Sequence, residues 1–388
     1  METRALLTVC PGGGNRPGRR GLKGLGRGLG QWFKRDMQTP AWHPDTLARK
    51  QPFLDVRRAA LKAVRAYFQA EGFNEVETPA LQVSPGIERH IRPMATQLRE
   101  PFGEGAAPRY LHTSPEFAMK RLLAGGMKKI VQICHVWRDG ERSPLHHPEF
   151  TMLEWYRAGA DYSAVMADCE AVLRHVAKAA ERTQQNGTDL RWQGRVADAG
   201  GAFERLTVHE AFARFAGIDL LSTIVDPHAP APAPEKLKDA ARAKGLHVSD
   251  SDTWEDTFFR IMLERIEPQL GTPVPTILFE YPANLAALAR RKPGQEAVAE
   301  RFELYACGVE LANAYSELTD AAEQRARFSH DRALHEQLYG SAPPLDEDFL
   351  AALEHLPPCA GAALGFDRLV MLASGASDIT DVLWSPVV

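Results

Sequence analysis

The chain has 388 residues, of which 44% are hydrophobic, and its formal net charge of -4 gives no global attraction to nucleic acid. Five cysteines without a C-x-x-C pair argue against a disulfide scaffold or a zinc cluster and favour a reducing, cytoplasmic compartment. No apolar stretch is long enough to span a bilayer, so no membrane partner is expected.

The N-terminal segment 1–36 differs from the rest of the chain. It is rich in glycine and carries eight Lys or Arg against two acidic residues, so it cannot bury a core of its own. Two interpretations stay open: a disordered basic tail that contacts an acidic partner, or a segment that is not natural, with synthesis starting at Met37. Residues 37–388 are predicted to fold as one domain.

Helix and strand patterns alternate from residue 52 onward. Apolar residues recur at helical spacing over Pro52–Gln69, and a strand pattern follows over Phe73–Pro79. The plain interpretation of this pair is an ordinary helix and an edge strand. Another helix is predicted to start further on. Its cap is Ser114, its first helical position is Pro115, and its first turn carries the acid Glu116.

The stretch Ile130–Tyr156 combines strand patterns with a dense set of ionisable side chains. Two apolar runs, the first ending before Arg138 and the second running over Phe150–Tyr156, predict antiparallel strands joined by a charged loop. An arginine at a strand end suits bidentate capture of a phosphate. A solvated hairpin is the alternative, but it does not explain Glu149 and Glu154 within apolar sequence, where an unpaired carboxylate is costly to bury.

The remaining elements are predicted from periodicity and turn residues. Helices are expected over Asp161–Thr183, Val208–Ala216, Glu235–Lys244 and Trp254–Gln269, and a strand over Thr276–Tyr281. A hairpin over Arg301–Tyr305 and Gly308–Asn313, a helix after Asp320, and a small-residue segment Gly361–Gly365 that leads into a helix complete the chain.

Three segments together resemble the signature motifs of class II aminoacyl-tRNA synthetases of the lysyl branch. They are Val76–Pro79, the run from Arg138-Asp139-Gly140-Glu141 to His-His-Pro-Glu-Phe-Thr-Met-Leu-Glu-Trp-Tyr, and Gly361–Arg368. The resemblance covers roughly residues 53–386. Within the lysyl branch the chain is similar to the elongation factor P lysine ligases, which resemble a lysyl-tRNA synthetase reduced to its catalytic domain.

The resemblance implies an α+β class II synthetase fold, an antiparallel β-sheet flanked by helices, with residues 184–272 as a helical elaboration. It also implies a homodimer joined through residues 52–79. The implied reaction is activation of lysine, expected as (R)-β-lysine, with ATP and Mg2+, followed by transfer to a lysine side chain of elongation factor P.

Aminoacylation of tRNA and a catalytically silent regulatory paralogue are the alternatives. Only about fifty residues precede the first predicted helix, fewer than a domain-sized anticodon module needs, so tRNA is not expected as a partner. A silent paralogue is expected to lack an arginine or glutamate of the site, yet Arg138, Glu310, Glu317 and Arg368 are all present.

Roles are carried over from the family residue by residue. The expected catalytic residues are Arg138, Arg368 and Glu310. The expected substrate contacts are Ser114, Glu116, Glu154, Tyr156, Glu317 and Ala363. The expected ATP contacts are Arg138, Asp139, Glu141, His147, Glu310, Leu311, Gly365 and Arg368, and the expected ligands of Mg2+ are Glu310 and Glu317.

The chain departs from the family pattern at several positions. Ala314 stands where the family usually has glycine, His147 where it usually has asparagine, and Pro144 where a basic residue is common. The acid of the loop comes one residue later than in some relatives, so Glu141 is the expected adenine contact. Ala363 matches the alanine of the elongation factor P ligases rather than the glycine of lysyl-tRNA synthetases.

Overall fold

The structure is a computed structural model, and it describes residues 40–86, 88, 90–102, 105–184, 187–229 and 231–387. The predicted tail 1–36, with both of its interpretations, lies outside these residues. Two compact units divide the chain after Arg49, and the second unit, Lys50–Val388, contains the main sheet and the candidate site.

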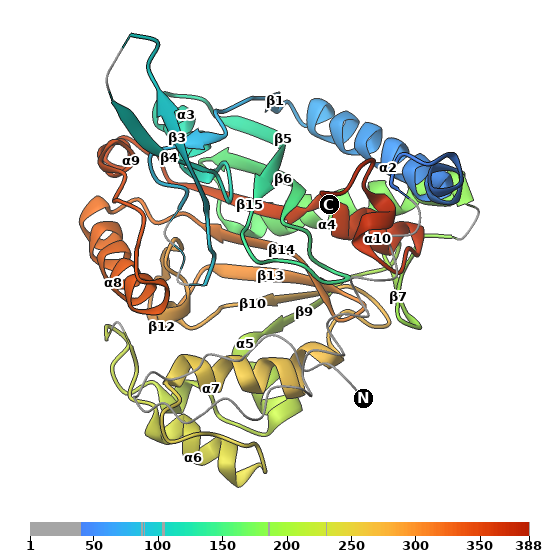
Figure 1. The fold of residues 1–388 in the computed structure, drawn as a ribbon. Helices are drawn as coiled ribbons and strands as arrows, with labels where there is room; N and C mark the ends of the chain where they lie inside the picture. Colours follow the sequence, from blue (N-terminus) through green and yellow to red (C-terminus); the bar gives the residue numbers. More distant parts are fainter. Residues whose placement is uncertain are drawn as a thin grey trace, which may run out of the picture. The chain divides into compact units, whose positions relative to one another are not determined.

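The second unit is built on an eight-stranded sheet with the order β1-β5-β6-β15-β14-β13-β10-β9 (Figure 1). Its strands are β1 (Asn74–Glu75), β5 (Lys129–Trp137), β6 (Glu149–Ala158), β15 (Cys359–Gly365), β14 (Val309–Ser316), β13 (Arg301–Ala306), β10 (Thr276–Phe279) and β9 (Glu204–Thr207). The five pairings in the middle are antiparallel, which confirms the predicted α+β class. At the two edges β1 pairs with β5, and β9 with β10, in parallel.

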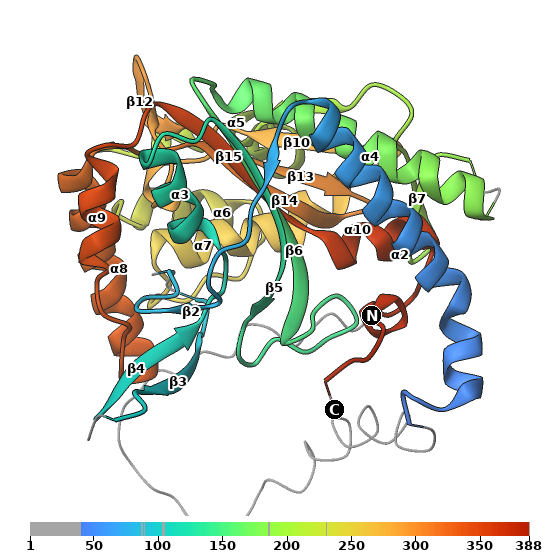
Figure 2. The ribbon, with the colours of Figure 1, turned by 90° about the horizontal axis from the view of Figure 1, so that it is seen from above.

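One face of the sheet is covered by α2 (Pro44–Ala70), α4 (Tyr162–Gln184) and α10 (Phe366–Ser374). Figure 2 shows α2 and α4 side by side. Because side chains of a strand alternate between its faces, Leu153 and Trp155 of β6 join this core while Glu154 and Tyr156 point to the opposite face. The alternation therefore separates a packed face from a polar one.

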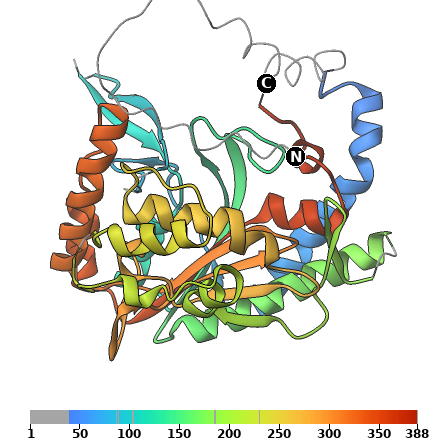
Figure 3. The ribbon, with the colours of Figure 1, turned by 90° about the horizontal axis from the view of Figure 1, so that it is seen from below.

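Two smaller cores lie beside the polar face. The first joins α3 (Glu116–Ala124), α8 (Ala321–Tyr339) and α9 (Glu347–Leu353). The second joins α5 (Val208–Ala211), α6 (Glu235–Ala243) and α7 (Trp254–Ile261) with strands β9, β10 and β13. Figure 3 shows the yellow helices α6 and α7 grouped together, apart from the blue α2.

The interval 184–272 contains strands as well as helices. Besides β9 it holds β7 (Asp189–Trp192) and β8 (Arg195–Asp198), which pair with each other. The sequence interpretation named only helices here, because four-residue strands give too short a pattern to be recognised by periodicity. Outside this interval, β2 (Leu81–Gln82), β4 (Ala106–Leu111) and β3 (Met94–Arg99) form one small sheet, and β11 (Arg291–Lys292) and β12 (Gln295–Ala299) form another.

Most predicted elements are present with shifted ends. The predicted helix Pro52–Gln69 lies inside the longer α2, whereas the predicted strand Phe73–Pro79 is reduced to the two residues of β1. The predicted helix Trp254–Gln269 becomes α7 followed by two short helical turns. Within the described part of the chain, no helix is both long enough and apolar enough to cross a membrane.

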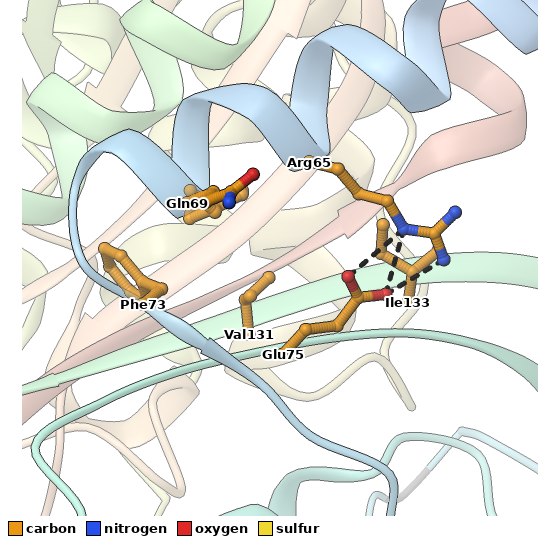
Figure 4. A pocket seen from close by; sticks show the side chains of 7 residues that line it. Arg65, Gln69, Phe73, Glu75, Val131 and Ile133 are labelled. Atoms are coloured by element: carbon orange, nitrogen blue, oxygen red, sulfur yellow. Dashed lines mark hydrogen bonds and ion pairs between the residues drawn. The ribbon is translucent and has the colours of Figure 1, made fainter.

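The C-terminal part of α2 and the edge of the sheet enclose a pocket (Figure 4). Its lining residues are Arg65, Phe68, Gln69, Phe73, Glu75, Val131 and Ile133. The Arg65 guanidinium binds the Glu75 carboxylate with nitrogen–oxygen distances of 2.9 to 3.2 Å. Apart from Val131 and Ile133 of β5, these residues belong to the segment 52–79, for which the family resemblance implies a dimer contact.

Candidate active site

The candidate site lies on the polar face of the sheet, where four neighbouring strands bring their side chains into register. Two cross-strand rows can be followed from β6 through β15 and β14 to β13. The first row is Glu154, Ala363, Asn313 and Glu303, and the second is Tyr156, Gly361, Tyr315 and Arg301. The rows join residues that lie more than 200 positions apart in the sequence.

A pocket at one end of these rows is lined by Glu116, Tyr156, Asn313, Tyr315, Glu317, Gly361, Ala362 and Ala363. The helix α3 supplies Glu116, whose Oε2 accepts a hydrogen bond of 3.0 Å from the hydroxyl of Tyr315. Glu317 follows β14 directly, and its backbone N–H donates to the Cys359 carbonyl of β15 at 2.9 Å. The predicted substrate residues Glu116, Tyr156, Glu317 and Ala363 therefore come together here.

Lys120 lies between the two glutamates of this pocket. Its ammonium binds the Glu116 carboxylate and lies 2.5 Å from Oε2 of Glu317. Both Lys120 and Glu317 are almost fully buried. Burial raises the pKa of Glu317 to about 8. The negative charge of Glu116 also raises this pKa, whereas the positive charge of Lys120 lowers it. The other oxygen of Glu317, Oε1, is buried and has no hydrogen-bond partner, and Glu317 lines the pocket.

Glu154 forms the neighbouring wall of the site. Its two carboxylate oxygens accept hydrogen bonds from the Ser114 hydroxyl at 2.5 Å and the Tyr156 hydroxyl at 3.0 Å. The side chain is fully buried, and this burial together with the charge of Glu116 raises the pKa of Glu154 to about 8. A positive group that enters the pocket would favour the ionised carboxylate and lower that pKa.

Gly361 is required by the close approach of Tyr156 on the adjacent strand. A Cβ atom at this position would overlap the Tyr156 ring and lie 3.0 Å from Oε1 of Glu317. The missing side chain thus makes room for both groups. Gly361, Ala362 and Ala363, from the predicted small-residue segment, line the pocket.

A β-bulge in β14 brings Glu310 to the polar face. Opposite Leu304 and Tyr305 of β13, strand β14 contains one extra residue, so that Leu311 and Ala312 both pack into the covered core. Glu310 and Asn313 consequently share the polar face although they are three residues apart. Without the bulge, an odd separation would place them on opposite faces.

Charges of both signs lie close to Glu310: the Glu303 carboxylate, and the Arg368 guanidinium, whose NH1 is 3.9 Å from Oε2 of Glu310. Burial and the Glu303 carboxylate raise the pKa of Glu310 to about 7. Glu303 itself is held by the hydroxyls of Tyr281 and Tyr305, each at 2.6 Å, and by the Arg301 guanidinium at 2.6 Å. Both Glu303 oxygens are therefore engaged, whereas the Glu310 carboxylate could bind a hard cation.

Arg368, at the start of α10, lies beside Glu310. Its guanidinium donates to the Glu310 carbonyl at 3.0 Å and the Leu145 carbonyl at 3.2 Å, and it lies 2.6 Å from Nε2 of His146. Burial and the charges of Arg368 and Arg138 lower the pKa of His146 to about 4, so the imidazole is neutral at pH 7 and accepts from Arg368. Two arginines and a neutral histidine thus share one end of the site.

Arg138 begins the loop after β5, as predicted. Its guanidinium carbon lies 5.2 Å from the centre of the Phe150 ring, and its NH1 lies 3.9 Å from the carboxylate of Glu141. The exposed Asp139 is bound by Arg92 at 3.1 Å. Arg138, Asp139 and Glu141 therefore lie together in this loop, with the aromatic face of Phe150 next to them.

Three of the predicted nucleotide contacts offer no free polar side-chain atom to a ligand. His147 is buried: Nδ1 binds the Glu149 carbonyl at 2.5 Å, and Nε2 accepts from the Val387 N–H at 3.1 Å. The Leu311 side chain packs on the covered face of the sheet, which leaves only its backbone for a ligand. Gly365 ends β15 at the cap of α10.

Several site residues were not identified from the sequence. Asn313 and Tyr315 alternate with buried residues of β14, and this period-two pattern ahead of Glu317 was the available signal. Lys120 lies one helical turn after Glu116, a spacing that places both side chains on the same face of α3. Glu303 and His146 gave no local signal, because each acquires its neighbours only through the tertiary fold.

A buried network supports Arg368 from behind. Arg57 of α2 forms an ion pair with Asp367, and the second Asp367 oxygen accepts from the Thr151 backbone N–H of β6 at 2.7 Å. Arg57 also donates to the Thr151 hydroxyl at 2.7 Å. The network joins α2, β6 and the start of α10, and thereby fixes the backbone from which Arg368 extends.

The chain matches a family model described as tRNA synthetases class II (D, K and N) over residues 46–388. Three relatives are named "Elongation factor P--(R)-beta-lysine ligase". Those of Pseudoalteromonas translucida and Vibrio cholerae are each 37% identical, over 85% and 86% of this chain and 94% of each relative. That of Proteus mirabilis is 37% identical over 88% of this chain and 98% of the relative.

Proposed function

The chain belongs to the class II tRNA synthetase family of the D, K and N type, and we propose that it activates (R)-β-lysine and transfers it to a lysine side chain of elongation factor P. Membership of this family implies that the chain uses ATP. The observation that carries the proposal is the continuous polar face that joins the pocket of Glu116 and Glu317 to the arginines Arg138 and Arg368.

Recognition of the amino acid rests on the buried carboxylates. A lysine isomer brings two ammonium groups, and the carboxyl groups of Glu116 and Glu317 line the pocket, with Glu154 next to them. The unpartnered Oε1 of Glu317 is available to accept from one ammonium group. Tyr156 and Tyr315 flank the methylene chain with aromatic surface, which suits the apolar middle of such a substrate.

Activation requires the substrate carboxylate to attack the α-phosphate of ATP, with formation of an acyl-phosphate bond and release of pyrophosphate. No protein nucleophile is needed. Arg138 and Arg368 bind and orient the phosphates and neutralise the charge that develops during in-line displacement. The acceptor amine then attacks the acyl carbon as a neutral group, AMP leaves, and an amide bond remains.

Mg2+ is proposed at Glu310. Burial and the nearby Glu303 carboxylate raise the pKa of this carboxyl, and a bound cation would lower it. The Glu310 carboxylate would hold the ion, which when bound would supply positive charge at the ATP phosphates. Glu317 was the companion expected from the sequence, but its Oε2 is engaged by Lys120. Among the described residues, no group of three or more His, Cys, Asp or Glu side chains could hold a metal ion by itself.

Elongation factor P is proposed as the acceptor because the relatives carry it in their names. The same relatives make tRNA the weaker candidate. We also propose a homodimer joined through residues 52–79, because the family resemblance implies a dimer contact there. Sedimentation of a monomer at micromolar concentration would contradict this proposal.

The proposed activity is tested by exchange of pyrophosphate into ATP, followed by mass spectrometry of elongation factor P after incubation with ATP and each lysine isomer. We expect exchange that depends on a lysine isomer and Mg2+, and a mass increase of the acceptor. Arg138→Ala and Arg368→Ala should each lower the exchange rate on the order of a hundredfold. Arg99→Ala, on the exposed strand β3, is the matched control. Unchanged exchange in both site variants, or charging of tRNA in place of the protein acceptor, would refute the assignment.

A further inference from the structure

The loop 282–290, between β10 and β11, lies against the end of β14. Three buried alanines of this loop belong to a small core against which the Tyr315 side chain packs. Ala289 of the loop forms an isolated antiparallel β-bridge with Glu317. Both Tyr315 and Glu317 line the candidate pocket. Two residues of the pocket therefore rest on this loop.

The backbone on either side of Glu317 is hydrogen-bonded to the loop. The Leu318 N–H donates to the Leu288 carbonyl at 2.9 Å. The Arg290 N–H donates to the Ser316 carbonyl at 2.8 Å. Because these two bonds flank Glu317 directly, a displacement of the loop would either move the Glu317 backbone or break the bonds.

Arg327 of α8 in turn holds the loop. Its Nη1 donates to three loop carbonyls, at 2.6 Å to Ala286, 3.2 Å to Ala287 and 3.0 Å to Ala289. Its Nη2 donates to the Glu323 carboxylate, one turn earlier on α8, at 2.5 Å. The Arg327 side chain is only 15% exposed, so water has little access to these contacts. Carbonyls that lose a buried donor are left without a partner, which is costly.

An arginine suits this position because its planar guanidinium carries several donors in a fixed geometry. One end can bind the carbonyls of the loop while the other end binds a carboxylate. Gln324, three residues before Arg327 and fully buried, adds a further donor: its Nε2 donates to the Ala287 carbonyl at 3.0 Å. Donors from one face of α8 thus converge on the loop that forms the bridge to Glu317.

We propose that Arg327 is a positioning residue for the substrate: by fixing the loop 282–290 it places Glu317 and Tyr315 in the pocket. Arg327 does not line the pocket itself, so its effect passes through the loop. The arginines proposed for the ATP phosphates extend from other elements, the loop after β5 and α10. Loss of Arg327 should therefore weaken binding of the lysine isomer and spare that of ATP. This inference rests on the proposed function, which supplies the identity of the ligand.

Two substitutions of Arg327 separate the contribution of its donors. Arg327→Met removes every donor to the loop carbonyls, and the KM for the lysine isomer should rise about tenfold, because small displacements of a binding group are costly. The KM for ATP should stay within about twofold of the wild type. Arg327→Lys keeps a charged donor on a side chain without the planar fork, and the KM for the lysine isomer should rise by a smaller factor, about threefold.

The experiment combines three measurements on the full chain. Pyrophosphate exchange at varied lysine and varied ATP gives the two KM values, and titration calorimetry gives the affinity for each lysine isomer. Hydrogen exchange followed by mass spectrometry reports on the peptides that contain Arg290 and Leu318, whose N–H groups join the loop to β14. Arg325→Met is the matched control, because this half-exposed arginine of α8 pairs with Glu347 instead of the loop. It should behave as the wild type in all three measurements.

The proposal is supported if Arg327→Met raises the KM for the lysine isomer alone and accelerates hydrogen exchange at Arg290 and Leu318 but not in β5. It is overturned if a folded variant keeps the wild-type KM and exchange rates. It is also overturned if both KM values rise together while exchange accelerates equally in all peptides, since Arg327 would then only stabilise the fold. Should Arg327→Met fail to fold, Arg327→Lys decides by the same criteria.

Failure of the proposed function gives a different result from failure of this inference. If the wild type binds a lysine isomer in the calorimeter but shows no pyrophosphate exchange, the proposed function fails, and the affinities of the variants still decide the role of Arg327. If the wild type binds neither isomer, the pocket is not a lysine site, and the placing of a substrate by Arg327 is refuted with it. The hydrogen exchange of Arg290 and Leu318 then still shows whether Arg327 holds the loop.

Discussion

Substitution of Gly361 by alanine is a direct test of the pocket geometry. The new methyl group would overlap the Tyr156 ring on the neighbouring strand, where both side chains are confined by the sheet register. Ordinary carbon contacts are about 3.5 Å or longer, so the ring has to move by about 1 Å or more. The Tyr156 hydroxyl, now 3.0 Å from Glu154, would then lie beyond hydrogen-bond distance.

The magnitude follows from this lost contact. Glu154 is fully buried, and a buried carboxylate that loses one of its two donors costs about 1–3 kcal/mol. Since 1.4 kcal/mol corresponds to about tenfold in an equilibrium constant, the KM for the lysine isomer should rise about ten- to a hundredfold. Overpacking adds a stability loss of about 1–3 kcal/mol.

The assay is pyrophosphate exchange at varied lysine concentration, together with urea unfolding. Gly105→Ala is the matched control, because a methyl group there meets no atom within 4 Å. It should change neither the KM nor the midpoint of unfolding. A folded Gly361→Ala protein with an unchanged KM would refute the role given to the Tyr156 contact.

Three further predictions concern substrate specificity, the stability of the fold and proton release on binding. Ala363→Gly should shift the ratio of activation efficiencies toward α-lysine by about tenfold, and a fixed ratio with both efficiencies reduced would make Ala363 a packing residue. Asp367→Asn should lower the free energy of unfolding by about 3–5 kcal/mol, because it leaves Arg57 buried without its counter-charge; a loss below about 1 kcal/mol in urea unfolding would contradict this. Binding of lysine at pH 7 should release protons, because ammonium groups lower the pKa of Glu154 and Glu317 from about 8; calorimetry in buffers of different ionisation enthalpy measures this, and buffer-independent heats would contradict it.

The direction of the pH effect follows from those pKa values. Without ligand the two carboxyls are largely protonated below pH 8, and an ammonium group binds the ionised form. Affinity for a lysine isomer should therefore rise with pH up to about 8. It should fall again only when the substrate amines lose their own protons.

The sequence by itself determined the elements that carry the chemistry. The apolar runs on either side of Arg138 predicted the hairpin of β5 and β6, and the structure has it with Arg138 at the strand end. The capping pattern at Ser114–Glu116 predicted α3, but the helix begins at Glu116 with Pro115 at its N-cap, so the predicted cap Ser114 lies one residue too early; its hydroxyl accepts from the Glu116 N–H at 3.0 Å. These features are local, because period-two alternation, helical periodicity and capping residues can each be recognised within ten to twenty residues of sequence.

The tertiary structure decided which of these residues meet. The place of Glu310 on the same face as Asn313 depends on one extra residue in β14, and a bulge leaves no mark in the hydrophobic pattern. His146, which was not among the predicted contacts, reaches Arg368, whereas His147, the predicted ATP contact, is buried against the Glu149 carbonyl and the Val387 N–H. The site of Lys120 between Glu116 and Glu317 required α3 to pack against the end of β14, almost 200 residues later. Long-range register is fixed by the burial of whole faces, which no local window of the sequence contains.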